Sequence, residues 1–354
     1  MKKAIRVILF VLLALVLLVA ALFAWLTATA LNPETEGATL TEREAGTAAF
    51  APGDTISILT WNTGYAALGE ESDFFMDGGE QTRPESRNIV QKNLDGIIAR
   101  VSQTGADFTF LQEVDSGSTR SYGVMETDAI GEALGLTSAY ARNYKCSFVP
   151  YPIPPIGKVS SGLYTLSTAA VDSYERVALP SPFKWPVSVA NLKRCLLVTR
   201  IPLTGTDREL VLVNLHLEAY DDGEGKAAQT QVLTEFLQGE YEKGNYVVAG
   251  GDFNQTFPGA LRSYPIKNEE LWTPGTLDDA MLPDGWHFAY DTETPTCRLL
   301  NEPYDPESPN TQYYVIDGFI LSPNMSLEAV QTLDAGFTYA DHNPVLLNVK
   351  LGAD

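Results

Sequence analysis

Residues that could do chemistry lie at the end of the stretch Tyr246–Asn254, which reads Tyr-Val-Val-Ala-Gly-Gly-Asp-Phe-Asn. Here an apolar run and two glycines precede Asp252 and Asn254. Side chains alternate between the two faces of an extended chain, so Asp252 and Asn254 are expected on the same face. A carboxylate and a carboxamide at the end of a strand can orient a water molecule beside a metal ion or a phosphate. An ordinary strand followed by an Asx turn would explain the same residues. The rest of the chain therefore has to decide between these two interpretations.

Several other strand-like runs end in residues of the same kind, and two of the three histidines are among them. Carboxylates such as Glu113 are hard oxygen ligands that suit Mg²⁺, Mn²⁺ or Ca²⁺. The sequence contains no P-loop, no serine nucleophile elbow and no HExxH zinc motif. Water, a divalent cation and imidazole remain, which indicates hydrolysis of a phosphoester. The strand-end residues are Asn62, Glu113, His216, Asp252, Asn254, Asp317, Asp341 and His342.

The motifs around these residues resemble those of the endonuclease/exonuclease/phosphatase (DNase I-like) superfamily in their order and approximate spacing. They read LTWNTG, LQEVD, NLHLE, GGDFN, VIDGF and ADHNPV, and they cover about residues 55–351. The resemblance implies an α/β (α+β) fold, a four-layer sandwich of two mixed β-sheets flanked by helices. It also implies a phosphoester hydrolase, because the superfamily includes nucleases, sphingomyelinases and inositol polyphosphate phosphatases.

The resemblance further implies a metal site. Glu113 would bind the ion, with Asn62 and Asp341 close enough to assist. The ion would be Mg²⁺ or Mn²⁺, with Ca²⁺ as a further option.

Roles for the remaining residues also follow from the resemblance. Asp252 would orient or deprotonate the attacking water, and Asn254 would help to position it. His342, paired with Asp317, and His216 would donate hydrogen bonds to the phosphoryl oxygens. Fixed donors directed at a phosphoryl transition state are a general catalytic resource, so the physical argument agrees with these roles.

Less specific interpretations exist for each residue alone. His216 and His342 could each be structural histidines, and Asp317 could cap a turn before Gly318. A non-catalytic surface module that keeps the fold is the alternative function, and a structural cell-envelope protein is a third. Loss of motif residues would favour the module, and none of them is missing. The sequence therefore favours a hydrolase whose substrate, a lipid headgroup, a nucleic acid or a small phosphodiester, stays open.

The chain has 354 residues and a formal net charge of −21, with no block of lysine or arginine. This balance makes it a poor non-specific binder of nucleic acid, because few cations are available to release phosphate counterions. The three cysteines, Cys146, Cys195 and Cys297, lack zinc-type spacing and leave one disulfide as an option. Cys195 lies in an apolar run and is expected to be buried.

Residues 1–31 are predicted to be a transmembrane anchor. Val7–Leu26 carries no charge, and as a helix it would span about 30 Å, the thickness of a bilayer core. Three cations precede this run, which predicts a single pass with the N-terminus in the cytoplasm and the rest outside the cell.

A cleaved signal peptide is the alternative for this segment, because residues 28–30 resemble a cleavage site and the protein would then be secreted. The apolar run exceeds the usual signal core, which favours the anchor. Residues 32–54 are predicted to be a linker and residues 55–354 a single catalytic domain. The expected partners are the phosphoester and the membrane, and no obligate protein partner is implied.

Strand-like and helix-like segments alternate along the catalytic domain. The 194–203 and 209–217 runs are expected to form a hairpin. The other predicted strands are Thr55–Asn62, Asp107–Val114, Gly162–Ser167, Val171–Ala178, Tyr313–Leu321 and Pro344–Leu351. The predicted helices are Pro84–Ser102 with Pro84 in its first turn, 126–135 closed by Gly135, and Glu224–Gln238.

Three stretches depart from familiar members of the superfamily and are expected to carry specificity: residues 66–83, 145–159 and 258–312. The 145–159 stretch and Pro180–Pro186 are predicted to be proline-rich loops. Several aromatic residues in these loops are expected to pack more often than to bind substrate, namely Phe74, Phe75, Tyr151, Phe183 and Trp185. His287 belongs to no motif and is expected to be a surface histidine.

Overall fold

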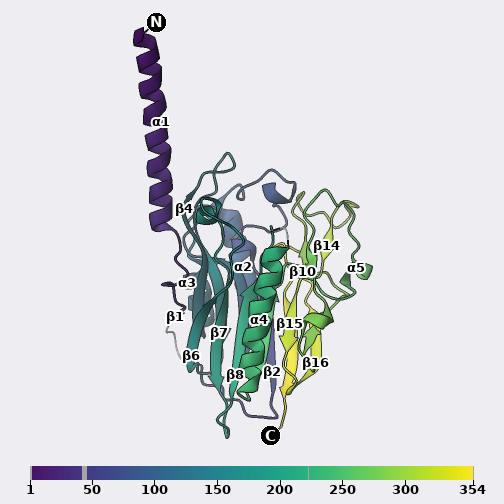
Figure 1. Ribbon diagram of the computed structural model, residues 1–354. Coiled ribbons are helices and arrows are strands. Elements are labelled where there is room, and N and C mark those ends of the chain that lie inside the picture. Colours follow the sequence, from purple (N-terminus) through teal and green to yellow (C-terminus); the bar gives the residue numbers. More distant parts are fainter. Residues whose placement is uncertain (1, 42–45, 222, 354) are drawn as a thin grey trace.

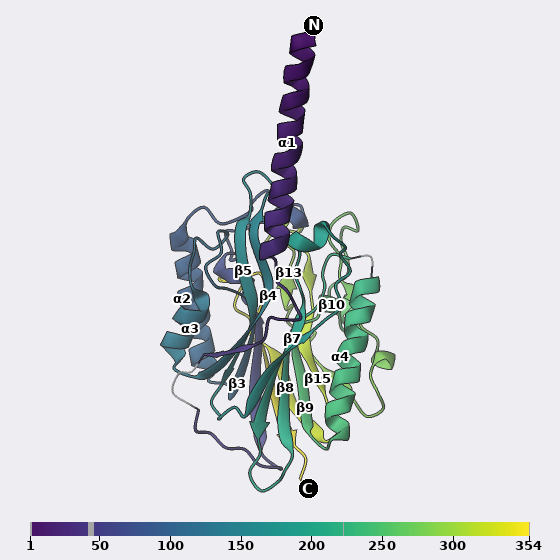
Figure 2. The ribbon, with the colours of Figure 1, turned by 60° about the vertical axis from the view of Figure 1, so that its left-hand side comes forward.

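In the computed structural model, which describes residues 2–41, 46–221 and 223–353, two mixed β-sheets pack face to face. Helices cover the outer face of each sheet, so the domain has the four layers that the motifs predict (Figures 1 and 2). The seven-stranded sheet has the order β1-β4-β5-β3-β2-β17-β16. The six-stranded sheet has the order β12-β15-β9-β8-β7-β6.

The first sheet consists of β1 (Thr39–Thr41), β4 (Thr137–Val149), β5 (Gly157–Ser167), β3 (Phe108–Asp115), β2 (Thr55–Asn62), β17 (Val345–Leu351) and β16 (Met325–Thr332). The second consists of β12 (His287–Ala289), β15 (Asp317–Leu321), β9 (Tyr246–Asp252), β8 (Glu209–His216), β7 (Cys195–Pro202) and β6 (Ser173–Ala178). The helices are α1 (Lys2–Thr29), α2 (Arg87–Thr104), α3 (Glu126–Leu134), α4 (Glu224–Glu242) and α5 (Ala260–Ser263). Shorter elements are β10 (Gln255–Thr256), β11 (Gly275–Thr276), β13 (Cys297–Arg298), β14 (Tyr313–Tyr314), η1 (Gly64–Ala66), η2 (Phe75–Asp77), η3 (Val187–Ala190) and η4 (Asp279–Met281).

Alternation along the central strands builds three apolar layers. In β2, Ile56 and Ile58 face the space between the sheets, whereas Leu59 and Trp61 face α2 and α3. In β8 and β9 the even-numbered residues likewise face the other sheet, and the odd-numbered ones face α4. Each strand is apolar on both faces because both faces are covered.

The two glycines before Asp252 allow close strand packing. A Cβ atom on Gly250 would lie 2.3 Å from the Phe319 ring of β15, and one on Gly251 would lie 2.0 Å from the Leu215 carbonyl oxygen of β8. Larger residues would push β9 away from both neighbours. The Gly-Gly pair therefore places Asp252 between those neighbouring strands.

Several predicted elements need correction. Residues 145–159 do not form one loop, because β4 continues to Val149 and β5 begins at Gly157. The 313–321 run is not one strand: β14 pairs with β13, and β15 joins the six-stranded sheet. Pro84 precedes α2, whose N-cap is Ser86. Strands β4 and β16 are absent from the sequence-based assignment.

The other predicted elements are confirmed within one to a few residues, including the β7–β8 hairpin and the α3 helix with Gly135 as its C-cap. The three cysteines are free and buried. Residues 42–45 of the predicted linker lie outside the described residues. The remainder of that segment packs along the domain, since β1 pairs with β4 and Phe50 is buried in the inter-sheet core.

Helix α1 is long and apolar enough to cross a membrane, the only such helix among the described residues. It rises from one end of the sandwich, and the C-terminus lies at the other end (Figures 1 and 2). Strand β17 runs toward the C-terminal end and is antiparallel to β2. Strand β2 therefore ends, at Asn62, on the side of the molecule from which α1 emerges.

Candidate active site

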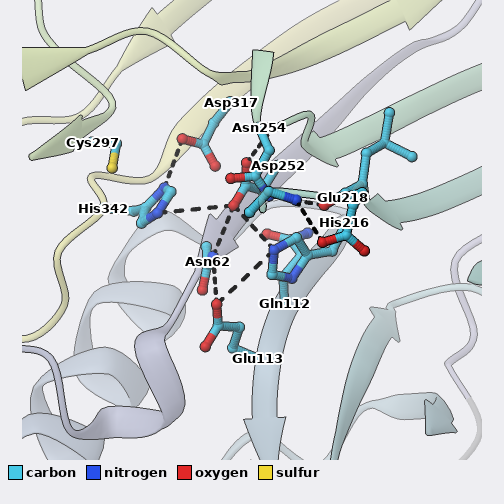
Figure 3. A network of polar contacts seen from close by, with 12 residues as sticks. Asn62, Gln112, Glu113, His216, Glu218, Asp252, Asn254, Cys297, Asp317 and His342 are labelled. Atoms are coloured by element: carbon cyan, nitrogen blue, oxygen red, sulfur yellow. Dashed lines mark hydrogen bonds and ion pairs between the residues drawn. The ribbon is translucent and has the colours of Figure 1, made fainter. Parts of the chain in front are cut away.

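The inter-sheet layer changes from apolar to polar at the α1 end of the sandwich. The inward-facing positions of β2, β8, β9 and β15 continue past the apolar core to Asn62, His216, Asp252 and Asp317. These side chains meet in a cleft of about 630 Å³ that is lined by seven of the eight predicted residues, all except Asp317. Asp317 lies next to His342, and a dashed line in Figure 3 marks the contact between them.

Asp252 is at the centre of this cluster. Its Oδ2 atom accepts a hydrogen bond from Asn62 Nδ2 at 3.0 Å and lies 3.4 Å from His216 Nε2 and 3.9 Å from His342 Nε2 (Figure 3). Asp317 on β15 and His216 on β8 are its direct neighbours across the six-stranded sheet. The Asn62 contact connects the two sheets. One buried carboxylate thus collects donors from both halves of the sandwich.

Glu113 reaches the cleft because β3 contains a bulge. Alternation would direct residue 113 toward the helices, but the β3–β5 register shifts between Leu111 and Val114, and Val114 packs on the helix side instead. Glu113 has φ of 58°. Bulges commonly redirect side chains near active sites, and strained φ angles cluster there. The Glu113 Oε1 atom accepts from Asn62 Nδ2 at 3.3 Å and lies 4.0 Å from His216 Nε2.

The two histidines of the cleft have opposite charge preferences. Burial disfavours the charged form of His342, but the Asp317 carboxylate, 2.8 Å from Nδ1, holds the pKa of His342 well above its usual range. Burial, with the positive charges of Arg194 and His342, lowers the pKa of His216 well below its usual range. These shifts favour the charged form of His342 and the neutral form of His216.

The carboxylates of the cleft are destabilised by burial and by one another. Burial and the adjacent Asp317 raise the pKa of Asp252 to about 7. Burial and the charge of Glu113 raise the pKa of Asp341 to about 7. Asp341 Oδ1 is buried and has no hydrogen-bond partner in the described part of the chain.

These features fit a divalent cation. A cation would stabilise the ionised carboxylates and provide a partner for the orphaned Asp341 oxygen. Two groups have potential donor atoms within 4.8 Å of one another, Cys297 with Asp341 and His342, and Asp252 with Asp317 and His342. His342 belongs to both, and its charged form offers no lone pair to an ion, so the carboxylates are the better ligands. Oxygen ligands predominate in the cluster as a whole, and they suit Mg²⁺ or Mn²⁺.

Asn254 does not continue the alternation of β9. The strand ends at Asp252, and Asn254 has φ of 51°. The Asn254 backbone N–H donates to Asp252 Oδ1 at 2.8 Å, and its side chain donates to the Leu217 carbonyl at 2.9 Å. The Asx turn and the polar site are therefore not alternatives. The turn is part of the site, because it fixes the orientation of the Asp252 carboxylate.

Several residues of the site were not found from the sequence. Arg120 lines the cleft, forms two hydrogen bonds to Asp115 and stacks on Tyr65, with its guanidinium carbon 3.6 Å from the ring centre. Cys297 lies beside His342 on the short strand β13, and burial raises the pKa of its thiol to about 12. Neither residue ends a long strand, so the strand-end pattern could not indicate them.

The cleft walls include side chains from residues 66–83, 145–159 and 258–312 and from the 180–186 loop. Phe74, Phe75, Tyr151 and Phe183 all line the cleft. Trp185 lies outside it and packs against Phe23 of α1. His287 is a half-buried residue of edge strand β12, away from the cleft.

Solved structures with this fold share little sequence with the chain. The endonuclease/exonuclease/phosphatase from Beutenbergia cavernae matches with a TM-score of 0.59 and 18% identity, over 84% of this chain and 72% of that one. ANGEL2, a 2',3'-cyclic phosphatase in complex with adenosine-2',3'-vanadate, matches with a TM-score of 0.55 and 16% identity, over 84% and 96%. D. rerio TDP2 complexed with a single strand DNA product matches with a TM-score of 0.52 and 15% identity, over 84% and 99%. No protein-family model and no curated protein matches the chain. These similarities confirm the predicted DNase I-like fold.

Proposed function

We propose that this chain, which has the endonuclease/exonuclease/phosphatase fold, is an exported phosphoester hydrolase that depends on a divalent metal ion. One observation carries the proposal: the Asp252 carboxylate lies within 4 Å of Asn62, His216 and His342 in an open cleft. A purely structural carboxylate does not need two histidines, and burying it beside Asp317 costs stability. Such arrangements of titratable groups with perturbed pKa values are characteristic of catalytic sites.

Glu113, Asn62 and Asp341 would hold the metal ion, Mg²⁺ or Mn²⁺. When bound, such an ion acts as a Lewis acid on a phosphoryl oxygen. Glu113 is suited to this role because its carboxylate is directed into the cleft by the bulge and remains 24% exposed. Asp341 is suited because one of its oxygens lacks a partner in the described structure.

Asp252 would orient the attacking water and accept its proton. A pKa near 7 matches a general base that works at neutral pH. The Asx turn with Asn254 and the hydrogen bond from Asn62 hold the carboxylate in a single orientation. Asn254 would position the water through the same turn.

His342 and His216 would stabilise negative charge on the phosphoryl group. The charged imidazole of His342, fixed through Nδ1 by Asp317, presents Nε2 to the cleft. The neutral imidazole of His216 presents its Nε2 beside Asp252 and Glu113. Preorganised donors of this kind contribute on the order of 10²–10³ in rate each.

Helix α1 would keep the enzyme at the cell membrane, with the catalytic domain outside the cell. Support comes from its length, its apolar sequence and the three cations that precede it. Secretion after cleavage is the alternative. The alternative for the domain itself is a non-catalytic binding module.

The test is hydrolysis of bis-p-nitrophenyl phosphate and p-nitrophenyl phosphate by the full chain with Mg²⁺, Mn²⁺ or EDTA. His216→Ala and His342→Ala should each lower turnover, and His287→Ala provides a matched control because this third histidine is outside the cleft. Equal turnover in all three variants would reject the site. A folded wild-type chain that binds metal but turns over neither substrate would support the binding module.

A further inference from the structure

We propose that the substrate is a membrane-resident phosphoester lipid, which enters the cleft from the same bilayer that holds α1. This inference rests on the proposed hydrolase and assigns it a substrate class. It follows from the relation between the cleft, the root of α1 and a set of exposed apolar side chains.

The lining of the cleft combines the polar Asp252 cluster with a group of apolar side chains. The apolar group comes from η2, the end of β4 with the β4–β5 loop, and the segment before β7, which also contribute Asp77 and Asn191. We call this group the apolar wall, and its members are Phe75, Met76, Val149, Tyr151, Ile156 and Leu192. A ligand with a phosphate at one end and a hydrocarbon portion at the other complements such a cleft.

The root of α1 packs against the outside of this wall. Leu26 is buried in one apolar cluster with Val149, Val189, Ile156 and Leu192. Three of these residues, Val149, Ile156 and Leu192, also line the cleft. The residues that anchor α1 to the domain are therefore part of the apolar wall.

Polar contacts fix the same junction. Trp185 Nε1 donates to Thr27 Oγ1 at 3.1 Å, and Ser147 Oγ donates to Thr29 Oγ1 at 2.8 Å. The uninterrupted apolar run of α1 ends at Leu26, and Thr27 is the first polar residue after it. At 1.5 Å rise per residue, only about 5 Å of helix separates Leu26 from Thr29. The surface of the bilayer therefore lies within about one helical turn of the apolar wall.

Exposed apolar side chains lie on the β4–β5 loop and on the 185–187 segment, which carries the Trp185 contact with α1. We call Tyr151, Ile153, Trp185 and Val187 the apolar rim, and they are 68%, 94%, 63% and 56% exposed. The β4–β5 loop, which carries the first two, projects from the same end of the domain as α1 (Figures 1 and 2). Scattered exposed apolar residues are ordinary, but a group of them at the base of a membrane helix, including tyrosine and tryptophan, is typical of a surface that enters the bilayer interface.

The charges of the cleft argue against a nucleic acid. Its arginines are already engaged within the described structure: Arg120 by Asp115, Arg194 by the His216 carbonyl beside Glu218, and Arg298 by three backbone carbonyls. No continuous series of free cations is available to follow a polyanion in the described part of the chain, and the net charge is −21. Binding of nucleic acid depends mainly on such cations.

The experiment uses the full chain reconstituted in vesicles that contain phosphatidylcholine, phosphatidylethanolamine, phosphatidylglycerol and sphingomyelin. Release of headgroup or phosphate from the vesicles is measured beside hydrolysis of soluble bis-p-nitrophenyl phosphate and of plasmid DNA. Ile153→Asp and Val187→Asp alter the rim without touching the cleft lining, and Leu327→Asp on β16, an exposed apolar residue at the opposite edge of the sheet, is the matched control.

Each rim variant should lower lipid turnover about tenfold, because it removes one apolar contact with the bilayer. Leu327→Asp should not change lipid turnover, and all three variants should hydrolyse bis-p-nitrophenyl phosphate at the wild-type rate. Hydrolysis of the soluble substrate without any lipid turnover, or a clear preference for DNA, would overturn this inference and leave the proposed function intact. Failure to hydrolyse every substrate would overturn both.

A second readout does not require turnover. Lipids brominated near the headgroup should quench the fluorescence of Trp185 in the reconstituted chain. The quenched fraction in wild type should exceed that in Trp185→Phe, because Trp25 of α1 is quenched equally in both. No difference between the two proteins would place the rim in water and contradict the inference.

Discussion

Asp317 Oδ2 lies 2.8 Å from His342 Nδ1, and both side chains are almost completely buried. The register of β9 and β15 places Asp317 directly opposite Asp252, so two carboxylates and one imidazole form a single buried unit. The pair orients His342 so that its Nε2 faces the cleft. It also raises the pKa of His342 and so favours the positively charged imidazole.

Replacement of Asp317 by asparagine should remove that charge and leave the shape of the site unchanged. We expect kcat for bis-p-nitrophenyl phosphate to fall by about 10²–10⁴, with a much smaller change in KM. The pKa of His342, followed by NMR, should fall, and the three histidines can be assigned with single variants. An unchanged pKa in Asp317→Asn would show that the carboxylate does not control His342.

Substitutions at Glu113 should separate stability from activity. An alanine retains the cost of a left-handed backbone, whereas a glycine does not. Glu113→Gly should therefore unfold with a free energy about 1 kcal/mol higher than Glu113→Ala, although both should lose metal-dependent turnover. Denaturant titrations of the two variants measure the difference, and equal stabilities would contradict the strain.

Most of this site could be predicted from the sequence because its residues lie at equivalent positions, the inward-facing ends of central strands. Asn62, His216 and Asp252 each end a central strand on the inward-facing phase of alternation, so period and position alone bring them together. Glu113 lies in the cleft as predicted, but strand alternation is not the reason. Its phase is wrong for the cleft, and the bulge that corrects it depends on pairing with β5, a tertiary feature.

Strand β16, the end of β4 and the role of Arg120 in the cleft could not be recognised from the local sequence. Strand β16 has an edge position and mostly exposed side chains, so its apolar alternation is weak. The end of β4 lies next to a proline-rich loop, and because prolines are typical of loops, the sequence predicts a loop over both. Arg120 is held in the cleft wall by contacts with Asp115 and Tyr65, and Tyr65 comes from a separate segment of the chain.

Asn214 connects the two sheets behind the cleft and should be important for stability. Its Oδ1 accepts from Gln112 Nε2 at 2.8 Å, and its Nδ2 donates to the Leu111 and Tyr164 carbonyls at 3.2 Å each. Asn214→Ala should lower the free energy of unfolding by about 2–4 kcal/mol, because it leaves several buried groups without partners. The double variant with Gln112→Leu should lose less than the sum of the two single variants. Additive losses would show that the two side chains do not interact.

Asp77, in the cleft wall, should make stability depend on pH. Burial raises its pKa from 3.8 to about 6, although Tyr220 donates a hydrogen bond to its Oδ1 atom at 3.0 Å. The folded chain therefore binds more protons than the unfolded chain between these values, so this residue's contribution falls as the pH rises from about 4 to about 6 and stays low above.

Asp77→Asn should remove that dependence. Its free energy of unfolding should exceed that of wild type by up to about 3 kcal/mol near pH 7 and match it near pH 4. Denaturant titrations of the detergent-solubilised chains at the two pH values measure the effect. A stability difference that does not change with pH would mean that folding does not shift the pKa of Asp77.

The most direct test compares kcat/KM for bis-p-nitrophenyl phosphate between wild type and Asp252→Asn in the presence of Mn²⁺. Asparagine retains the shape of the side chain and removes a buried negative charge, so thermal stability should not fall. We expect turnover to decrease by about 10³ or more, and EDTA to abolish the wild-type activity. A variant within about tenfold of wild type, or a wild type unaffected by EDTA, would contradict metal-dependent hydrolysis at Asp252.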